Sequence, residues 1–330
     1  MKFLDKTISP LGLGCWPIGG KMFSAEGTSL GYTNSNDSDA IKALQAAVAN
    51  GINLFDTAAA YGAGHSERLL ATALKNQPDA FIVTKIGIGI DEQSRALTGE
   101  QLEPESVLPA IDGCLKRLDR ECIDVVLLHP NTVPKDQADL IFDEMQNARQ
   151  LGKLKAFGWS TDIVANANTM NDRDGFKVVE HAMHVLMDAP DMQTLLQSTG
   201  LLSLIRSPLA MGLLSGKYTT ESTMPKDDIR ATKQDWTGYY IDGKPNPEYL
   251  TRFDAIRELL QSGGRTTVQG ALGWLWGKSI SNIPVPGART VEQVEGLAAA
   301  IALGALPDTV MSEIDSLLDD RFVCDGLSPR

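Results

Sequence analysis

The 330-residue sequence lacks the features that mark secreted, membrane and metal-binding proteins. Its four cysteines (Cys15, Cys114, Cys122 and Cys324) form no CxxC pair and no Cys/His spacing typical of zinc. We therefore expect no disulfide framework and no structural metal, and interpret the cysteines as reduced thiols of a cytoplasmic protein. No run approaches eighteen uncharged apolar residues, and residues 1–10 contain no apolar signal core, so we expect no membrane span.

Basic side chains are also in short supply. Thirty Lys and Arg stand against 42 Asp and Glu, which gives a formal net charge of −12. An acidic surface disfavours nucleic acid and anionic membranes as partners, so any anionic ligand must be held by a local cluster of donors. The sequence also lacks a Ser/Gly/Pro-rich linker and an internal repeat. We therefore expect residues 1–330 to form a single domain, and make no prediction of its oligomeric state.

Short β-rich runs alternate with longer helical patterns along the chain. Most of the runs are continuously apolar, which is typical of strands that are buried on both faces of a parallel sheet. The predicted strands are Leu11–Trp16, Asn53–Thr57, Phe81–Ile86, Asp124–His129, Ala156–Ser160, Lys177–His181, Leu204–Ser207 and Asn282–Val285. The predicted helices are Asp39–Asn50, His65–Lys75, Glu105–Leu118, Lys135–Leu151, Asp191–Thr199, Glu248–Gln261, Thr267–Lys278, Val291–Ala302 and Asp308–Asp320.

The regular alternation favours a closed (β/α)8 barrel over an open doubly wound sheet, because eight near-even units fill about 280 residues. The helix at Asp308–Asp320 would be an extra C-terminal helix. The long polar stretch Thr219–Pro247 follows the seventh strand, and irregular segments of that length are usually lids or binding loops. Pro109 is expected in the first turn of its helix, where a proline costs little.

Ionisable residues stand at the ends of three predicted strands, where a barrel carries its catalytic groups. They are Asp56, Lys85 and His129, and Tyr61 follows Asp56 by five residues. Each alone is more often structural, but together they can make a proton donor. A phenol has a pKa of about 10 and is a poor acid unless its phenolate is stabilised. Lys85 can stabilise it, His129 can add a hydrogen bond, and Asp56 can keep Lys85 charged.

Five segments, in this order, resemble the aldo-keto reductase superfamily: GINLFDTAAAYGAGHSE, FIVTKIG, VVLLHP, SPLAMGLLSGKY and IPVPGARTVEQVE. The resemblance extends from Leu11 to about Ala302. It implies a (β/α)8 barrel that binds NADPH without a Gly-rich Rossmann loop. It also matches Asp56, Tyr61, Lys85 and His129 to the family's catalytic tetrad, with Tyr61 as the general acid in reduction.

The same resemblance implies a set of cofactor contacts. Ser160 would hydrogen-bond the nicotinamide carboxamide, and the segment from Ser207 to Lys217 would bind the pyrophosphate through its backbone N–H groups. Arg289 and the start of the following helix would bind the 2′-phosphate. Trp16 would line the substrate pocket. The full expected set is Gly14, Trp16, Ser160, Thr161, Glu180, Arg206, Ser207, Leu209, Gly212, Ser215, Lys217, Gly287, Ala288, Arg289 and Gln293.

Several positions depart from the usual family pattern. Thr161 replaces an asparagine, and Arg206 replaces an aromatic residue that commonly stacks on nicotinamide. Glu180 replaces a glutamine, and a carboxylate can accept from the carboxamide but cannot donate to it unless protonated. Gly296 and Leu297 replace the Glu-Asn pair that usually contacts adenine. Other polar residues near the sixth strand are interpreted as structural or pocket-lining and not as a metal site: His181, His184 and Asp188.

We therefore expect an NADPH-dependent oxidoreductase that reduces a small aldehyde or ketone. A second hypothesis is a redox-sensing subunit of the same fold, which binds the cofactor with little turnover and acts on a partner protein. A third is a Schiff-base aldolase that uses Lys85, which ends a barrel strand. The identity of the natural substrate is left open.

Overall fold

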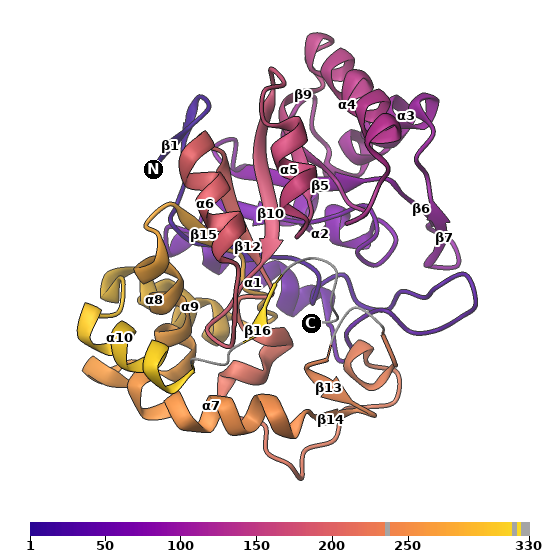
Figure 1. Ribbon diagram of the computed structural model, residues 1–330. Coiled ribbons are helices and arrows are strands. Elements are labelled where there is room, and N and C mark those ends of the chain that lie inside the picture. The colour runs from indigo at the N-terminus through magenta and orange to yellow at the C-terminus, as the bar shows by residue number, and fades with distance from the viewer. Residues whose placement is uncertain (235–237, 319–321, 325–330) are drawn as a thin grey trace.

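The computed structural model describes residues 1–234, 238–318 and 322–324, and its centre is one sheet of eight parallel strands (Figure 1). The first strand of the sheet is joined to the segment just after the last strand by a parallel bridge between Gly14 and Gly287, and the Gly14 N–H donates to the Pro286 carbonyl at 3.0 Å. The sheet is therefore a closed (β/α)8 barrel, as predicted. Its strands, in spatial order, are β15 (Asn282–Pro284), β12 (Leu202–Arg206), β10 (Phe176–Ala182), β9 (Leu154–Ser160), β8 (Ile123–Leu128), β5 (Phe81–Ile86), β4 (Leu54–Asp56) and β3 (Gly12–Gly14).

Helices surround the barrel (Figure 1). The nine predicted helices are present, and the structure adds the short, asparagine-rich α5, which the apolar pattern does not indicate. The helix ends differ from the predictions by a few residues; positions 319–320 of the last predicted helix lie outside the described residues. The helices are α1 (Asp37–Ala49), α2 (His65–Ala73), α3 (Pro104–Leu118), α4 (Lys135–Gln150), α5 (Val164–Met170), α6 (Pro190–Thr199), α7 (Pro247–Leu260), α8 (Thr267–Lys278), α9 (Val291–Leu303) and α10 (Asp308–Leu317).

One detail of α3 differs from its prediction. The helix begins at Pro104, so this proline occupies the first turn and Pro109 lies in the helix interior. The expectation that Pro109 stands in the first turn was wrong, because Pro109 is the sixth residue of the helix and already the fifth when counted from Glu105. Pro109 has no N–H to donate to the Glu105 carbonyl four residues earlier.

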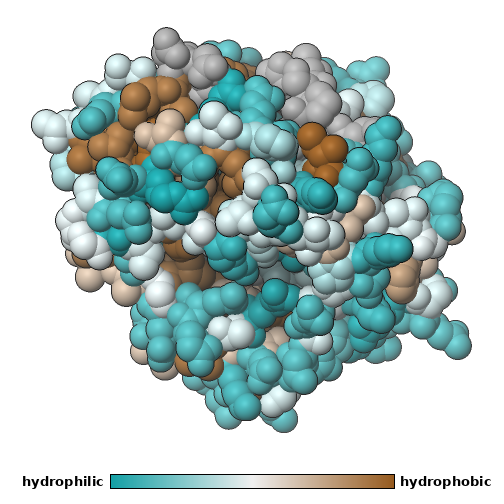
Figure 2. Space-filling model, turned by 90° about the horizontal axis from the view of Figure 1, so that it is seen from below, coloured by the Kyte–Doolittle hydropathy of each residue, from teal (hydrophilic) through white to brown (hydrophobic). Residues whose placement is uncertain are grey.

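Hydrophilic residues cover most of the face seen in Figure 2, and hydrophobic residues gather there in a few patches. This distribution agrees with the excess of acidic side chains in the composition. Among the described residues, no single helix has the length and hydropathy to cross a bilayer. The consecutive helices α9 and α10 have sufficient length and hydropathy only when they are taken together, and the chain bends by 115° at the break between them.

Short antiparallel hairpins lie at the two ends of the barrel, and none was predicted. Their strands are too short for a hydrophobic alternation to stand out in the sequence. The pairs are β1 (Lys2–Phe3) with β2 (Lys6–Thr7), β6 (Ile88–Asp91) with β7 (Ala96–Glu100), and β13 (Tyr240–Ile241) with β14 (Lys244–Pro245). A parallel pair joins β11 (Met187–Asp188) to β16 (Phe322–Val323).

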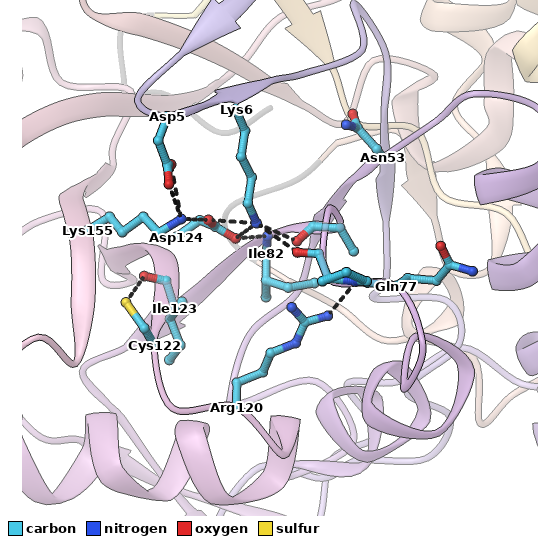
Figure 3. A network of polar contacts seen from close by, with 12 residues as sticks. Asp5, Lys6, Asn53, Gln77, Ile82, Arg120, Cys122, Ile123, Asp124 and Lys155 are labelled. Carbon is cyan, nitrogen blue, oxygen red and sulfur yellow. Dashed lines mark hydrogen bonds and ion pairs between the residues drawn. The ribbon is translucent and has the colours of Figure 1, made fainter.

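The N-terminal hairpin is tied to the amino ends of the barrel strands by a network of charges (Figure 3). Asp124, at the start of β8, lies 3.0 Å from the ammonium groups of both Lys6 and Lys155, and Lys155 also lies 2.9 Å from Asp5. The Ile82 N–H donates to Asp124 at 3.0 Å. We call Asp5, Lys6, Asp124 and Lys155 the lower cluster; it has two acids and two bases.

The barrel interior changes from apolar to charged along its axis. Side chains two residues apart on a strand share a face, so the inward positions of a strand form a series. The lower positions form a hydrophobic cluster that includes Leu54, Val83 and Val178. Two residues further along the same three strands, towards their carboxyl ends, the inward positions are ionisable. These positions are Asp56, Lys85 and Glu180.

Candidate active site

A cavity of about 1000 Å³ opens at the carboxyl ends of the strands. Its volume is at the upper end of the range for small-molecule sites, which suits a ligand as large as a dinucleotide together with a substrate. Loops from most of the βα units contribute to its wall. From the predicted set, it is lined by Asp56, Tyr61 and His129, and by Gly14, Trp16, Ser160, Glu180, Arg206, Ser207, Leu209, Gly212, Ser215, Lys217, Gly287, Ala288, Arg289 and Gln293.

Two residues of the predicted set do not border the cavity. Lys85 is 1% exposed and lies beneath Tyr61, where it reaches the cavity through the phenol. Thr161 is fully buried, and its hydroxyl donates to the Asn131 carbonyl at 2.9 Å, so it supports a neighbouring loop. The structure thus brings the rest of the predicted residues together, although they are spread over most of the chain.

Lys85 is the centre of the tetrad. Its Nζ lies 2.5 Å from Asp56 Oδ1, donates to the Thr57 carbonyl at 3.0 Å and reaches the Tyr61 hydroxyl at 3.4 Å. Burial raises the pKa of the Tyr61 phenol above its ordinary value, and the Lys85 ammonium opposes that rise. The Lys85 ammonium thus lies where a cation lowers the cost of ionising the phenol.

His129 completes the tetrad as a neutral imidazole. Its ring packs edge-on against that of Tyr61, with centroids 6.0 Å apart. Burial, assisted by the nearby charge of Lys85, lowers the pKa of His129 to about 3. Its Nδ1 has no hydrogen-bond partner within the described part of the chain. On the other side of the phenol, Trp16 stacks on Tyr61 at 5.9 Å and 13°, which fixes the orientation of the ring.

Glu180 makes a contact that the sequence did not predict. Its Oε2 lies 3.1 Å from Lys85 Nζ, so one buried ammonium faces two buried carboxylates. Neither oxygen of Glu180 accepts a hydrogen bond from any described residue. Burial and the neighbouring Glu180 charge raise the pKa of the Asp56 carboxyl to about 7, despite the opposing effect of Lys85. For Lys85, the two carboxylates outweigh burial and raise its pKa above the ordinary value.

Arg206 places a second cation, in addition to Lys85, near this end of the cavity. Its Nη2 lies 2.5 Å from the carboxylate of Asp162, which is 1% exposed. The other oxygen of Asp162 accepts from the Ala182 N–H at 2.7 Å, so the acid is anchored to β10. Sequence reasoning missed Asp162, although its place two residues after the end of β9 is a signal that could have found it.

Part of the predicted loop Thr219–Pro247 borders the cavity, at Ile229, Arg230 and Gln234. The Ile229 N–H donates to the Gly31 carbonyl at 2.9 Å, and Asp228 accepts from the Thr33 hydroxyl at 3.1 Å. Arg230 pairs with Asp228 and borders the cavity beside Tyr32. Arg230 and Tyr32 were missed because only the meeting of two loops, about 200 residues apart, makes them wall residues.

The far end of the cavity combines backbone and cationic groups. Before Lys217, the segment Ala210–Ser215 makes a 3-10 turn, in which Met211 and Gly212 have φ angles of 52° and 93°. Arg289 precedes α9, and its Nη1 donates to the Thr33 carbonyl at 2.5 Å. The Thr290 hydroxyl caps α9 by accepting from the Gln293 N–H at 3.3 Å, so the Arg289 guanidinium stands beside a capped helix start.

The remaining polar candidates are occupied by structural contacts. His181 Nε2 lies 3.0 Å from the Ser203 hydroxyl, and His184 Nε2 lies 3.2 Å from that of Tyr239. Both rings are fully buried and neither borders the cavity. Within the described residues, no group of three or more His, Cys, Asp or Glu side chains could hold a metal ion. These contacts favour the structural interpretation of both histidines.

Comparisons with known proteins match the chain along nearly its whole length. The model of the aldo/keto reductase family matches residues 10–319. Aldo-keto reductase YhdN of Bacillus subtilis is 26% identical over 98% of this chain and 93% of its own. A putative voltage-gated potassium channel subunit beta of Schizosaccharomyces pombe is 26% identical over 96% of this chain and 93% of its own. The structure of glycerol dehydrogenase AKR11B4 from Gluconobacter oxydans superposes with a TM-score of 0.79 and 28% identity, covering 96% of this chain and 94% of that one.

Proposed function

The chain belongs to the aldo/keto reductase family of NAD(P)H-dependent oxidoreductases, and we propose that it uses NADPH to reduce the carbonyl of a small aldehyde or ketone to an alcohol. The observation that carries this proposal is the linked group Asp56–Lys85–Tyr61 beside a neutral His129, at the base of a large cavity. Such a group can protonate a carbonyl oxygen, because the Lys85 ammonium stabilises the phenolate that remains.

The residues of this chain divide the reaction between them. When bound, NADPH supplies the hydride that adds to the carbonyl carbon. Tyr61 donates its phenolic proton to the carbonyl oxygen, and the Lys85 ammonium stabilises the phenolate that results. Neutral His129 hydrogen-bonds the same oxygen and orients the substrate. Asp56 keeps Lys85 charged and in place.

The cavity fits this cofactor in its chemistry as well as in its size. Ser160 and Glu180 would hold the nicotinamide carboxamide, and the Arg206 guanidinium would lie against the ring where the family commonly has an aromatic residue. The turn at Ser207, Leu209, Gly212 and Ser215 would bind the pyrophosphate through small side chains and backbone N–H groups, and Lys217 would add charge.

A preference for NADPH over NADH would come from Arg289. The 2′-phosphate carries nearly two negative charges, and the protein has a net charge of −12, so the discrimination must be local. Gly287 and Ala288 bring the backbone to the start of α9, where Gln293 accepts from the Arg289 N–H at 2.8 Å. The guanidinium and the first turn of the helix can then converge on one phosphate.

The structure bears on the two other hypotheses. A Schiff base needs Lys85 as a free amine, but two carboxylates hold it as an ammonium, which disfavours an aldolase. The redox-sensing subunit is supported by the channel-subunit relative. It predicts that the cofactor stays bound with negligible turnover and that a protein partner copurifies.

Purified protein, NADPH and a panel of small aldehydes and ketones test the proposal. We expect loss of NADPH absorbance with at least one carbonyl, and formation of the matching alcohol. Cofactor binding without turnover of any of them would overturn the reductase proposal in favour of the sensing subunit. Absence of NADPH binding would overturn both.

A further inference from the structure

The proposed reduction does not require a negative charge on Glu180. A glutamine, similar in shape, could hold a carboxamide equally well and would not place a second carboxylate beside Lys85. The Glu180 carboxylate is fully buried, borders the cavity and lies 3.1 Å from Lys85 Nζ. A buried carboxylate that shares its cation and accepts no hydrogen bond from the described residues is costly to maintain.

The charges around Glu180 do not balance. The surrounding elements contribute two other acids, Asp56 at the end of β4 and Asp162 after β9, against two cations, Lys85 on β5 and Arg206 on β12. The other titratable neighbours are neutral: Tyr61, His129, and the buried thiol of Cys15, whose pKa is raised by burial. With all three acids ionised, this end of the cavity therefore carries one uncompensated negative charge.

A ligand can supply the missing positive charge. The nicotinamide ring is neutral in NADPH and cationic in NADP⁺, so the two redox states of one cofactor differ by one charge at the end that would face Glu180. We propose that Glu180 makes this cavity select the oxidised cofactor: it raises affinity for NADP⁺ over NADPH and favours alcohol oxidation on the enzyme. This inference rests on the proposed function, because it requires the nicotinamide to occupy this end.

The same cluster makes the selection depend on pH. Burial and the Glu180 charge raise the pKa of the Asp56 carboxyl to about 7, so Asp56 gains or loses a proton near neutrality. Below this pKa the proton cancels the excess charge, and above it the full negative charge is present. Affinity for NADP⁺ should therefore rise as the pH passes upward through this pKa, whereas affinity for NADPH should change little. By linkage, NADP⁺ binding should release a proton.

Cofactor titrations followed by intrinsic tryptophan fluorescence test this without turnover. The dissociation constants of NADP⁺ and NADPH are measured across the pKa of Asp56, for the wild type and for Glu180→Gln. We expect Glu180→Gln to weaken NADP⁺ binding by about tenfold at the alkaline end, the effect of a single charge screened by its neighbours. NADPH binding should stay within about twofold, and the pH dependence for NADP⁺ should move to lower pH, because Asp56 loses the neighbouring charge that helps to raise its pKa.

Two further variants separate charge from structure. Glu180→Asp keeps the negative charge and should retain tighter binding of NADP⁺ and its pH dependence. Glu67→Gln removes another buried carboxylate, which lies outside the cavity wall and accepts from Arg117 and Thr84, each at 2.6 Å. This variant should leave the ratio of the NADP⁺ and NADPH dissociation constants unchanged.

The inference is overturned if Glu180→Gln weakens the binding of both cofactors equally. It is also overturned if the variant changes neither the ratio of the two dissociation constants nor the pH dependence of NADP⁺ binding. In either case the reductase proposal stands, because the wild type still binds its cofactor. A wild type that binds neither cofactor would remove the proposed function and this inference together.

Discussion

The two ends of the barrel carry clusters of Lys and acidic side chains that differ in charge balance and in burial. In the lower cluster, two lysines match two aspartates, and the lysine side chains are 16% and 30% exposed. A backbone N–H also satisfies Asp124. At the carboxyl end, Lys85 pairs with both Asp56 and Glu180, and none of the three side chains is more than 4% exposed. We call these three residues the upper cluster.

The difference shows where a barrel can place unbalanced charge. Balanced and partly solvated pairs gain little and perturb little, so the lower cluster ties the N-terminal hairpin to the barrel at low cost. In the upper cluster, burial and the second carboxylate raise the pKa of Asp56 to about 7. Strongly perturbed ionisable groups in a cavity are typical of functional sites, and they lie where barrels carry their chemistry.

The largest effect we expect is on turnover, from Tyr61→Phe. Removal of the proposed general acid should lower kcat by about 10²–10⁴. NADPH affinity should hardly change, since the hydroxyl serves the substrate oxygen. Steady-state kinetics with the best carbonyl substrate and a separate cofactor titration measure the two effects. A variant with normal turnover would show that another group supplies the proton.

Lys85→Met should produce the largest loss of stability. It leaves the carboxylates of Asp56 and Glu180 buried without a cation, which costs about 3–5 kcal/mol unless they bind protons. The folded-state pKa of Asp56 is already raised, so the folded protein binds the extra proton and the unfolded chain does not. The loss should therefore grow as the pH rises from the unfolded pKa of an aspartate, about 4, towards and beyond neutrality.

Urea denaturation at a series of pH values measures this dependence, and Lys6→Met in the lower cluster is the matched control. Lys155 still pairs with Asp124 in the control, so its loss should be small and nearly independent of pH above the range where aspartates titrate. If the two variants lost the same stability with the same pH dependence, the contrast between the clusters would be wrong.

The sequence predicted more of the fold than of the upper cluster. Mainly apolar runs such as Phe81–Ile86 and Asp124–His129 indicate buried parallel strands, and residues at their ends are therefore placed at one end of the barrel. Asp56, Lys85 and Tyr61 could be grouped because β4 and β5 are neighbours in both sequence and space.

The pairing of Glu180 with Lys85 could not be predicted in this way. Strand β10 stands across the barrel from β4 and β5, so their contact depends on closure and on side-chain length across the interior. The same reason applies to Tyr32 and Arg230, which meet only because two distant loops pack together. Contacts across a ring are properties of its three-dimensional closure, and the pattern of one strand does not encode them.

A third prediction concerns a cation at the rim of the same cavity. Arg289→Ala should remove a charge-assisted contact to the 2′-phosphate, worth about 1.5–3 kcal/mol, or about 10- to 150-fold in NADPH affinity. NADH affinity should remain nearly unchanged, because NADH has no 2′-phosphate. Titration of both cofactors against both proteins decides this. Equal losses for the two would show that Arg289 acts through its bond to the Thr33 carbonyl, as a structural residue.

The smallest effect should come from Lys155→Met, which breaks the lower cluster on its more exposed side. Methionine retains most of the apolar stem, and Lys6 still pairs with Asp124, so the free energy of unfolding should fall by only about 0–1 kcal/mol. A hydrogen bond from Lys155 lowers the pKa of Asp5 in the folded state. That contribution exists above the unfolded pKa and disappears as the pH falls through the folded one. The wild type and the variant should therefore converge in acid, and also at high salt, which screens exposed pairs.

Urea denaturation at two salt concentrations and two pH values tests this convergence, and the same preparations are assayed for turnover. Turnover should not change, because the lower cluster lies at the opposite end of the strands from the cavity. A drop in kcat with unchanged stability would mean that the amino ends of the strands control the geometry of the upper cluster. The two ends would then form one coupled system, and the contrast between a cluster for anchoring and a cluster for chemistry would have to be abandoned.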